Sequence, residues 1–123
     1  MNKKILVIED DNILQSAIAT SLKQSDFDVE QAFNGDDGIK MSKNGDIDLI
    51  LLDLLLPKKD GWEVLESLKK DEKSKDIPVF VLTVYEGEDS ISKCMDLGAN
   101  GYFIKSKYSL DEMIEKIKEE VQK

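Results

Sequence analysis

The sequence of 123 residues contains no histidine, no arginine and only one cysteine, Cys94. A chain without histidine cannot be a phosphohistidine donor, a histidine-dependent hydrolase or a histidine-ligated zinc protein. Arginine is the residue best suited to bidentate contacts with phosphates and base edges, so its absence argues against nucleic-acid binding. One thiol allows no internal disulfide and fits a reducing compartment. Such a thiol at an apolar position is more often part of the core than a nucleophile.

Long apolar runs and a leader sequence are missing as well. No apolar run approaches the roughly 20 residues that span a bilayer. The first four residues lead directly into a strand pattern, without the apolar stretch and cleavage site of a signal peptide. The composition is 41% hydrophobic and 35% charged, with a net charge of −9. We therefore expect one globular, cytoplasmic domain over residues 1–123, with no membrane insertion.

Short apolar segments alternate with helical patterns along the whole chain, as in successive βαβ units. The patterns predict strands over residues 3–8, 28–32, 48–52, 78–82 and 101–105. They predict helices over residues 34–43, 61–70 and 88–97, and a last helix that begins with a capping box of Ser109 and Glu112. They also predict a first helix, whose apolar side is formed by Ile13, Leu14, Ala17, Ile18, Ser21 and Leu22. Continuous apolar strands indicate a parallel α/β sheet with helices on both faces. This pattern alone leaves the strand order open.

Four of the apolar runs end at a polar residue. The first is followed by Glu9 and Asp10, and the others end at Asp53, Thr83 and Lys105. Since ligands bind at the carboxyl ends of parallel strands, these side chains are expected at one edge of the sheet. Crowded carboxylates repel each other, and a hard cation such as Mg²⁺ relieves that repulsion. One carboxylate could then accept a phosphoryl group, with the ammonium and the hydroxyl binding its oxygens.

Each of these features has a simpler interpretation when it is taken alone. Asp10-Asp11 could be favourable negative charge at a helix N-terminus, Thr83 a strand-end hydroxyl and Lys105 a surface lysine. We interpret Asp11 in this way, as a helix-start residue. The combination of all the features in this order is much more specific than any one of them.

The combined pattern resembles the receiver domain of two-component response regulators, in particular the single-domain type related to chemotaxis regulators. The resemblance covers essentially the whole chain. It is carried by ILVIEDD at 5–11, by LLDLLLP at 51–57 with Asp60-Gly61, by PVFVLT at 78–83 and by LGANGYFIK at 97–105. The resemblance implies a five-stranded parallel sheet with the flavodoxin-like strand order 2-1-3-4-5.

The resemblance also implies a role for each site residue. Asp53 would accept a phosphoryl group from a histidine kinase or a histidine phosphotransfer protein. Mg²⁺ would be held by Asp53, by Asp10 directly, by Glu9 through water and by the backbone carbonyl of Leu55. The family's switch hydroxyl, its phosphate-binding lysine and its switch aromatic correspond to Thr83, Lys105 and Tyr102.

A receiver of this kind is a phosphoacceptor rather than an enzyme. Phosphorylation is expected to change the surface formed by the fourth helix, the fifth strand and the fifth helix, and to present it to a downstream protein partner. The chain is expected to be a monomer or a weak, phosphorylation-dependent dimer. Its last residues follow the fifth helix closely, so we expect no output domain within this sequence.

Two departures from the family pattern lead to further predictions. Val84 stands where the family usually has a small residue, and the bulky residues Leu55 and Tyr85 flank the site, so we predict slow self-dephosphorylation. The family's lysine is usually followed by a proline in a cis bond. Here Lys105 precedes Ser106, and because a cis bond before a non-proline costs about 2.5–4 kcal/mol, we predict a trans bond.

Other functions remain open at this point. The chain could be a phosphorylation-independent interaction module on the same fold, or the excised receiver of a longer DNA-binding regulator or hybrid kinase. A haloacid-dehalogenase phosphatase would need Asp-x-Asp after the first strand, whereas the sequence Asp53-Leu54-Leu55 follows the third. A flavodoxin-like FMN carrier would need a Ser/Thr/Gly-rich loop where Glu9, Asp10 and Asp11 stand.

Overall fold

Strands and helices alternate throughout the computed structural model, which describes residues 2–56, 60–84 and 87–122. The strands are β1 (Lys4–Ile8), β2 (Asp28–Ala32), β3 (Leu49–Asp53), β4 (Val79–Thr83) and β5 (Gly101–Ile104). The helices are α1 (Asn12–Gln24), α2 (Gly35–Ser42), α3 (Gly61–Lys70), α4 (Glu88–Asp96) and α5 (Leu110–Val121). Every predicted element is present, and β2 and α3 have the predicted bounds.

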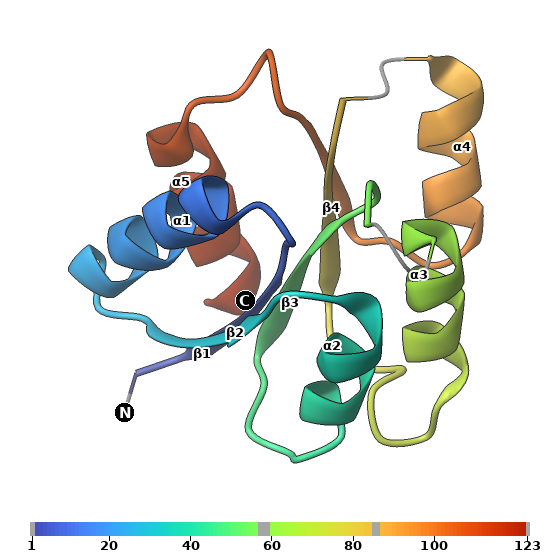
Figure 1. The fold of residues 1–123 in the computed structure, drawn as a ribbon, viewed down its shortest axis with the longest axis horizontal. Helices are drawn as coiled ribbons and strands as arrows, with labels where there is room; N and C mark the ends of the chain where they lie inside the picture. The colour runs from blue at the N-terminus through green and yellow to red at the C-terminus, as the bar shows by residue number, and fades with distance from the viewer. Residues whose placement is uncertain (1, 57–59, 85–86, 123) are drawn as a thin grey trace.

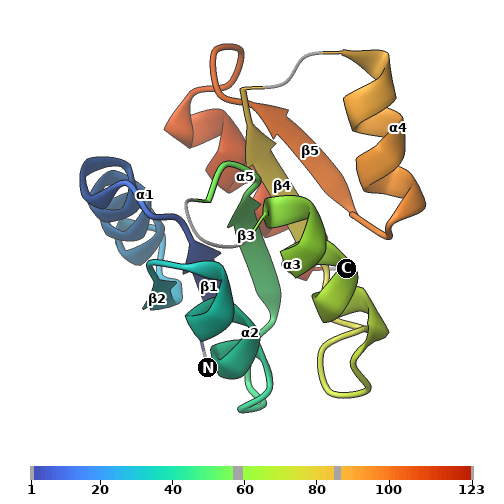
Figure 2. The ribbon, with the colours of Figure 1, turned by 45° about the vertical axis from the view of Figure 1, so that its right-hand side comes forward.

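The five strands form one parallel sheet in the order β2-β1-β3-β4-β5. This confirms the flavodoxin-like order. Helices α1 and α5 cover one face of the sheet, and α2, α3 and α4 cover the other (Figure 1). Figure 2 shows β5 at one edge of the sheet with α4 alongside it. No helix among the described residues is long and apolar enough to cross a lipid bilayer.

Successive residues of the central strands feed two separate apolar clusters, one on each face of the sheet. Side chains at alternate positions of β1 and β3 pack with α1 and α5, as Val7 and Leu51 do. The intervening positions, such as Ile8 and Leu52, pack with residues of α3 and α4. Because both faces are covered, the whole of β3 is buried, including Asp53 at its carboxyl end.

Side-chain caps fix the starts of α1 and α5. Asp11 caps α1 by accepting hydrogen bonds from the backbone N–H groups of Ile13 and Leu14, which confirms its interpretation as a helix-start residue. The capping box of Ser109 and Glu112 at the start of α5 is also confirmed. The Asp11 cap fixes the end of the β1–α1 turn, in which Glu9 and Asp10 stand.

The predicted apolar side of α1 is confirmed at Ile18 and Leu22, which are buried, and at Leu14, which packs against the same core cluster, but it was wrong at Ile13. The buried residues of α1 are Gln15, Ile18, Ala19 and Leu22. Ile13, which we placed on the apolar side, is 83% exposed, whereas Gln15 is fully buried. The error at the first turn arose because the prediction followed residue hydrophobicity alone. In the structure, the polar residue Gln15 occupies the buried side of the helix, in line with Ile18, Ala19 and Leu22.

Two smaller predictions concern single positions. Among the described residues there is no cis peptide bond, so the bond between Lys105 and Ser106 is trans as predicted. Cys94, on α4, is buried in the apolar cluster on the α2, α3 and α4 face of the sheet. Burial raises the pKa of its thiol to about 11, so this cysteine belongs to the core, as expected.

Candidate functional site

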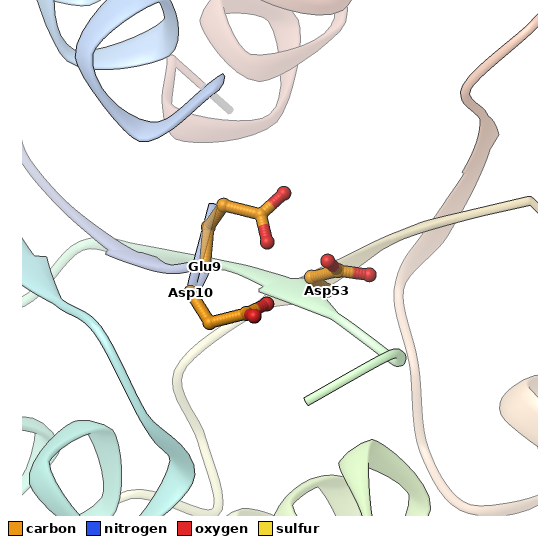
Figure 3. Close-up of side chains that lie close together, drawn as sticks. All are labelled: Glu9, Asp10 and Asp53. Carbon is orange, nitrogen blue, oxygen red and sulfur yellow. The ribbon is translucent and has the colours of Figure 1, made fainter. Parts of the chain in front are cut away.

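Three carboxylates meet at the carboxyl ends of β1 and β3. Glu9 and Asp10 follow β1, and Asp53 is the last residue of β3, the neighbouring strand. One carboxylate oxygen from each residue lies within 4.8 Å of the other two. Figure 3 shows the side chains of Glu9 and Asp10 extending from the end of β1 toward the strand that carries Asp53. Glu9 and Asp53 are buried, and Asp10 is exposed to solvent.

Among the described residues, one ammonium group contacts these acids, and it belongs to Lys105, which follows β5. The Nζ atom of Lys105 lies 3.1 Å from Oδ2 of Asp53 and 3.4 Å from Oε1 of Glu9. Lys105 directly follows β5, and its backbone N–H donates to the carbonyl of Thr83 at the end of β4. The parallel register therefore brings together side chains that are 52 and 96 residues apart in the sequence.

Among the described residues, the charges in this cluster do not balance, because three acids lie beside one ammonium group. Burial is the main cause that raises the pKa of Glu9 to about 8, and the hydrogen bond and the negative charge of Asp53 act in the same direction. Burial opposes the charged form of Lys105, but the charges of Asp53 and Glu9 outweigh it and raise the pKa of this lysine. An additional cation would favour the ionised form of Glu9.

The loop after β3 is tied closely to Asp53. The backbone N–H of Leu55 donates to Oδ1 of Asp53 over 3.0 Å. Gly61, at the start of α3, donates its N–H to the carbonyl of Leu54, and a Cβ atom at Gly61 would overlap the backbone of Leu54. Only glycine therefore allows α3 to approach this loop so closely.

The other predicted site residues lie on the neighbouring strands. Thr83 is fully buried at the end of β4, one residue beyond Leu82, which is the register partner of Asp53. Tyr102 lies on β5, is half-buried, and packs against the apolar cluster on the α3 and α4 face. The structure thus brings Glu9, Asp10, Asp53 and Lys105 into direct proximity, places Thr83 beside them, and keeps Tyr102 outside the acidic cluster.

Exposed aliphatic side chains stand in the segments that follow β1, β3 and β4. Ile13 on the β1–α1 side is 83% exposed, Leu55 after β3 is 44% exposed, and Val84 after β4 is 52% exposed. Tyr85, which we predicted to flank the site, and Pro57 of the LLDLLLP motif lie outside the described residues.

The sequence analysis missed Gln15 on α1. Its side-chain amide is fully buried and donates to the backbone carbonyls of Val7, Glu9 and Ala32. A signal was present, since position 15 continues the spacing of the buried residues Ile18, Ala19 and Leu22 toward the helix start.

Comparison with known proteins identifies the family. Residues 5–118 match the response regulator receiver domain family. The chain is 35% identical over 115 residues to the DNA-binding dual master transcriptional regulator RpaA of Synechocystis, an alignment that covers 94% of this chain and 47% of RpaA. The chain spans about half the length of several transcriptional regulators that it resembles.

Two solved structures have the same fold. A receiver domain protein (CheY-like) from Methanospirillum hungatei superimposes with a TM-score of 0.90 at 26% identity, covering 99% of this chain and 95% of that one. The receiver domain of the sensor histidine kinase PA1611 from Pseudomonas aeruginosa superimposes with a TM-score of 0.89 at 22% identity over the full length of both chains. That crystal structure has a magnesium ion coordinated in its active-site cleft.

Proposed function

The chain belongs to the family of response regulator receiver domains, and from this membership we propose that it is a phosphorylation switch whose phosphoacceptor is Asp53. The observation that supports this proposal most strongly is the buried carboxylate of Asp53, which ends the central strand within 3.1 Å of Lys105 and beside the acids that follow β1. This acidic cluster fits the phosphoacceptor site of the family.

The proposed reaction is a transfer from nitrogen to oxygen. An oxygen of the Asp53 carboxylate forms a bond to the phosphorus of a partner's phosphohistidine while the phosphorus–nitrogen bond breaks, and the electron pair returns to the imidazole nitrogen. Lys105 and Thr83 donate hydrogen bonds to the phosphoryl oxygens. Neither the attack nor the departure requires a histidine or cysteine of this chain.

The donor set at this edge also fits Mg²⁺, which prefers carboxylate, carbonyl and water oxygens. Three carboxylates within 4.8 Å of one another, with the pKa of Glu9 raised to about 8, form a site with a deficit of positive charge. We propose that Asp10 and Asp53 bind the ion directly, Glu9 through water, and Leu55 through its backbone carbonyl. A bound Mg²⁺ would supply charge neutralisation for the acids and the phosphoryl group.

The switch itself is proposed to run from Thr83 to Tyr102. Phosphorylated Asp53 would draw in the Thr83 hydroxyl and the Lys105 ammonium, and the vacated space would admit the ring of Tyr102. Helix α4, strand β5 and helix α5 would then present a different surface to a downstream protein. Such a change is a shift between populations of pre-existing states, and its complete reversal requires about 5.5 kcal/mol of differential binding.

The proposed phosphodonor is a histidine kinase or a histidine phosphotransfer protein. The acidic centre and the exposed side chains of Ile13, Leu55 and Val84 would contact a partner surface with apolar residues around its phosphohistidine. The chain would act in the cytoplasm, as a monomer or a weak phosphorylation-dependent dimer, without contacting nucleic acid directly.

We propose that the chain has no enzymatic activity apart from slow self-dephosphorylation. Leu55 is apolar and exposed beside Asp53, and Val84 occupies the position usually held by a small residue. Neither side chain can orient an attacking water by hydrogen bonding. The phosphoryl group on Asp53 should therefore persist long enough to be read by a partner.

A second candidate function is that of a receiver domain within a longer protein. The chain spans about half the length of its curated relatives. This coverage supports the alternative in which residues 1–123 are the receiver domain of a longer DNA-binding regulator or hybrid kinase. A phosphorylation-independent interaction module becomes the preferred function if Asp53 does not accept phosphate.

Intact mass measurement after incubation with acetyl phosphate and Mg²⁺ tests the proposal. The wild-type chain should gain one phosphoryl group, and only when Mg²⁺ is present. Asp53→Asn should gain none, while Asp46→Asn, which removes an exposed acid at the opposite edge of the sheet, should behave as wild type. Equal phosphorylation of wild type and Asp53→Asn would reject Asp53 as the phosphoacceptor.

A further inference from the structure

The amide of Gln15 occupies the junction of β1, β2 and α1, directly behind the acidic cluster. We infer that Gln15 is a positioning residue that fixes the backbone from which Glu9 and Asp10 project, and that its loss misplaces both carboxylates. The consequence for divalent-cation affinity rests on the proposed function. The positioning role itself concerns the arrangement of the chain alone.

Three carbonyl oxygens lie within hydrogen-bond distance of the amide nitrogen of Gln15 and share its two hydrogens. The Nε2 atom of Gln15 lies 3.2 Å from the carbonyl oxygen of Val7, 3.1 Å from that of Glu9 and 2.9 Å from that of Ala32. The backbone N–H of Glu9 donates to the same Ala32 carbonyl over 3.1 Å. One amide therefore joins the end of β1 to the end of β2 at the point where the chain turns toward Asp10.

The orientation of the Gln15 amide follows from its neighbours. All three surrounding groups are carbonyl oxygens, which only accept hydrogen bonds, so the nitrogen of the amide must face them. The oxygen, Oε1, consequently points away, and it is buried without a hydrogen-bond partner among the described residues. A buried polar atom without a partner typically costs about 1–3 kcal/mol.

This energetic cost argues against the interpretation that Gln15 serves only to pack the core. The residue stands in the buried stripe of α1 with Ile18, Ala19 and Leu22, where an aliphatic side chain would pack without leaving an unpaired oxygen. What an aliphatic side chain cannot supply is a donor for the carbonyls of Val7 and Glu9. Both carbonyls belong to the segment that leads into the acidic turn, and the second belongs to Glu9 itself.

Loss of the donor should therefore act on the acids. The carbonyl of Glu9 would lose the amide that bonds it, and the turn would have to move to find water or another donor. The carboxylate of Glu9, now 3.4 Å from Lys105, and that of the adjacent Asp10 would move with it. Removal of a group that hydrogen-bonds to a metal ligand and orients it commonly weakens metal binding by about 10–100-fold.

The test compares Gln15→Met, which keeps the length of the side chain and removes its donor, with Ser74→Ala. Ser74 is 1% exposed and donates its hydroxyl to the carbonyl of Leu68, in the segment between α3 and β4 at the opposite edge of the sheet. Its loss removes a buried hydrogen bond of the same kind without touching the acidic turn. Both variants would be compared with wild type in urea unfolding and in calorimetric titration with Mg²⁺.

Gln15→Met should bind Mg²⁺ about tenfold more weakly than wild type, whereas Ser74→Ala should bind it with unchanged affinity even if it is equally destabilised. A merely structural role would give both variants the same affinity, and that result would overturn the inference. Should Gln15→Met fail to fold, Gln15→Asn keeps the amide but shortens its reach. It should weaken binding in the same direction, and wild-type affinity in a folded Gln15→Asn would overturn the inference.

A second readout needs no cation. In metal-free protein, the backbone amide resonances of residues 9–11 should shift in Gln15→Met and remain in place in Ser74→Ala. If the wild-type protein bound no Mg²⁺, the proposed function would be contradicted. The positioning role of Gln15 would then be tested by these resonances alone. Unshifted resonances in a folded Gln15→Met would overturn the positioning role.

Discussion

The substitution Glu9→Gln should stabilise the metal-free protein at pH 8 and leave its stability nearly unchanged near pH 4. Burial, together with the hydrogen bond and charge of Asp53, raises the pKa of Glu9 from 4.5 to about 8 in the folded state. The folded chain therefore binds this proton more tightly than the unfolded chain does. The stability associated with the protonated carboxyl is fully present below pH 4.5 and is lost as the pH rises toward about 8.

The size of the effect follows from the pKa shift. One pKa unit corresponds to about 1.4 kcal/mol, so a shift from 4.5 to about 8 would correspond at most to about 5 kcal/mol. Relaxation and water penetration at the sheet edge reduce such values substantially. We therefore expect wild type to lose about 2–3 kcal/mol more than Glu9→Gln between pH 4.5 and pH 8.

The assay is urea unfolding at several pH values in buffer with a chelator, followed by far-ultraviolet circular dichroism. The unfolding midpoints of wild type and Glu9→Gln should diverge as the pH rises, with unchanged dependence on denaturant. Saturating Mg²⁺ should then favour wild type, because a cation stabilises the ionised cluster. Parallel stability curves for the two proteins across this pH range would refute the proposed electrostatic conflict.

Three further substitutions test separate parts of the site. Lys105→Gln removes the ammonium group 3.1 Å from Asp53. It should slow phosphorylation by acetyl phosphate on the order of a hundredfold and tighten Mg²⁺ binding in calorimetry. An unchanged phosphorylation rate and an unchanged Mg²⁺ affinity would contradict the role of this lysine. Leu55→Asn should speed loss of the phosphoryl group severalfold in a mass-spectrometric time course, whereas Ile13→Asn should not, and equal decay rates would disprove the predicted shielding. Gly61→Ala should lower the free energy of unfolding by about 2 kcal/mol because its Cβ atom would overlap the backbone of Leu54. The matched change at Gly87, where a Cβ atom meets nothing within 4 Å, should cost under about 1 kcal/mol, and equal losses would contradict this packing argument.

Much of the fold could be predicted from local pattern. The apolar runs that end at Asp53 and Thr83 correspond to the buried strands β3 and β4, because a strand covered on both faces has no polar positions to confuse the pattern. The capping box at Ser109 was visible because its two residues are separated by a fixed spacing. The strand order came from the resemblance to receiver domains, since periodicity within single elements carries no information about which strands are neighbours.

The parts that the sequence did not reveal depend on tertiary contacts. Residue type alone does not distinguish the buried Gln15 from a surface glutamine, because its partners are carbonyls at the ends of β1 and β2. The only local signal was its spacing from the apolar residues Ile18, Ala19 and Leu22. The exposure of Ile13 was missed for the related reason that the first turn of α1 was assigned by hydrophobicity. The raised pKa of Glu9 likewise arises from burial and from Asp53, which lies 44 residues away in the chain.

The most direct measurement is chemical identification of the residue that carries the phosphoryl group. Protein phosphorylated with acetyl phosphate and Mg²⁺ would be reduced with sodium borohydride, which converts an aspartyl phosphate to homoserine, and then digested for peptide mass spectrometry. We predict homoserine at residue 53 and at no other position. Homoserine at residue 10 or elsewhere, or an unmodified Asp53 in protein that has gained a phosphoryl group, would contradict the proposal that Asp53 is the phosphoacceptor.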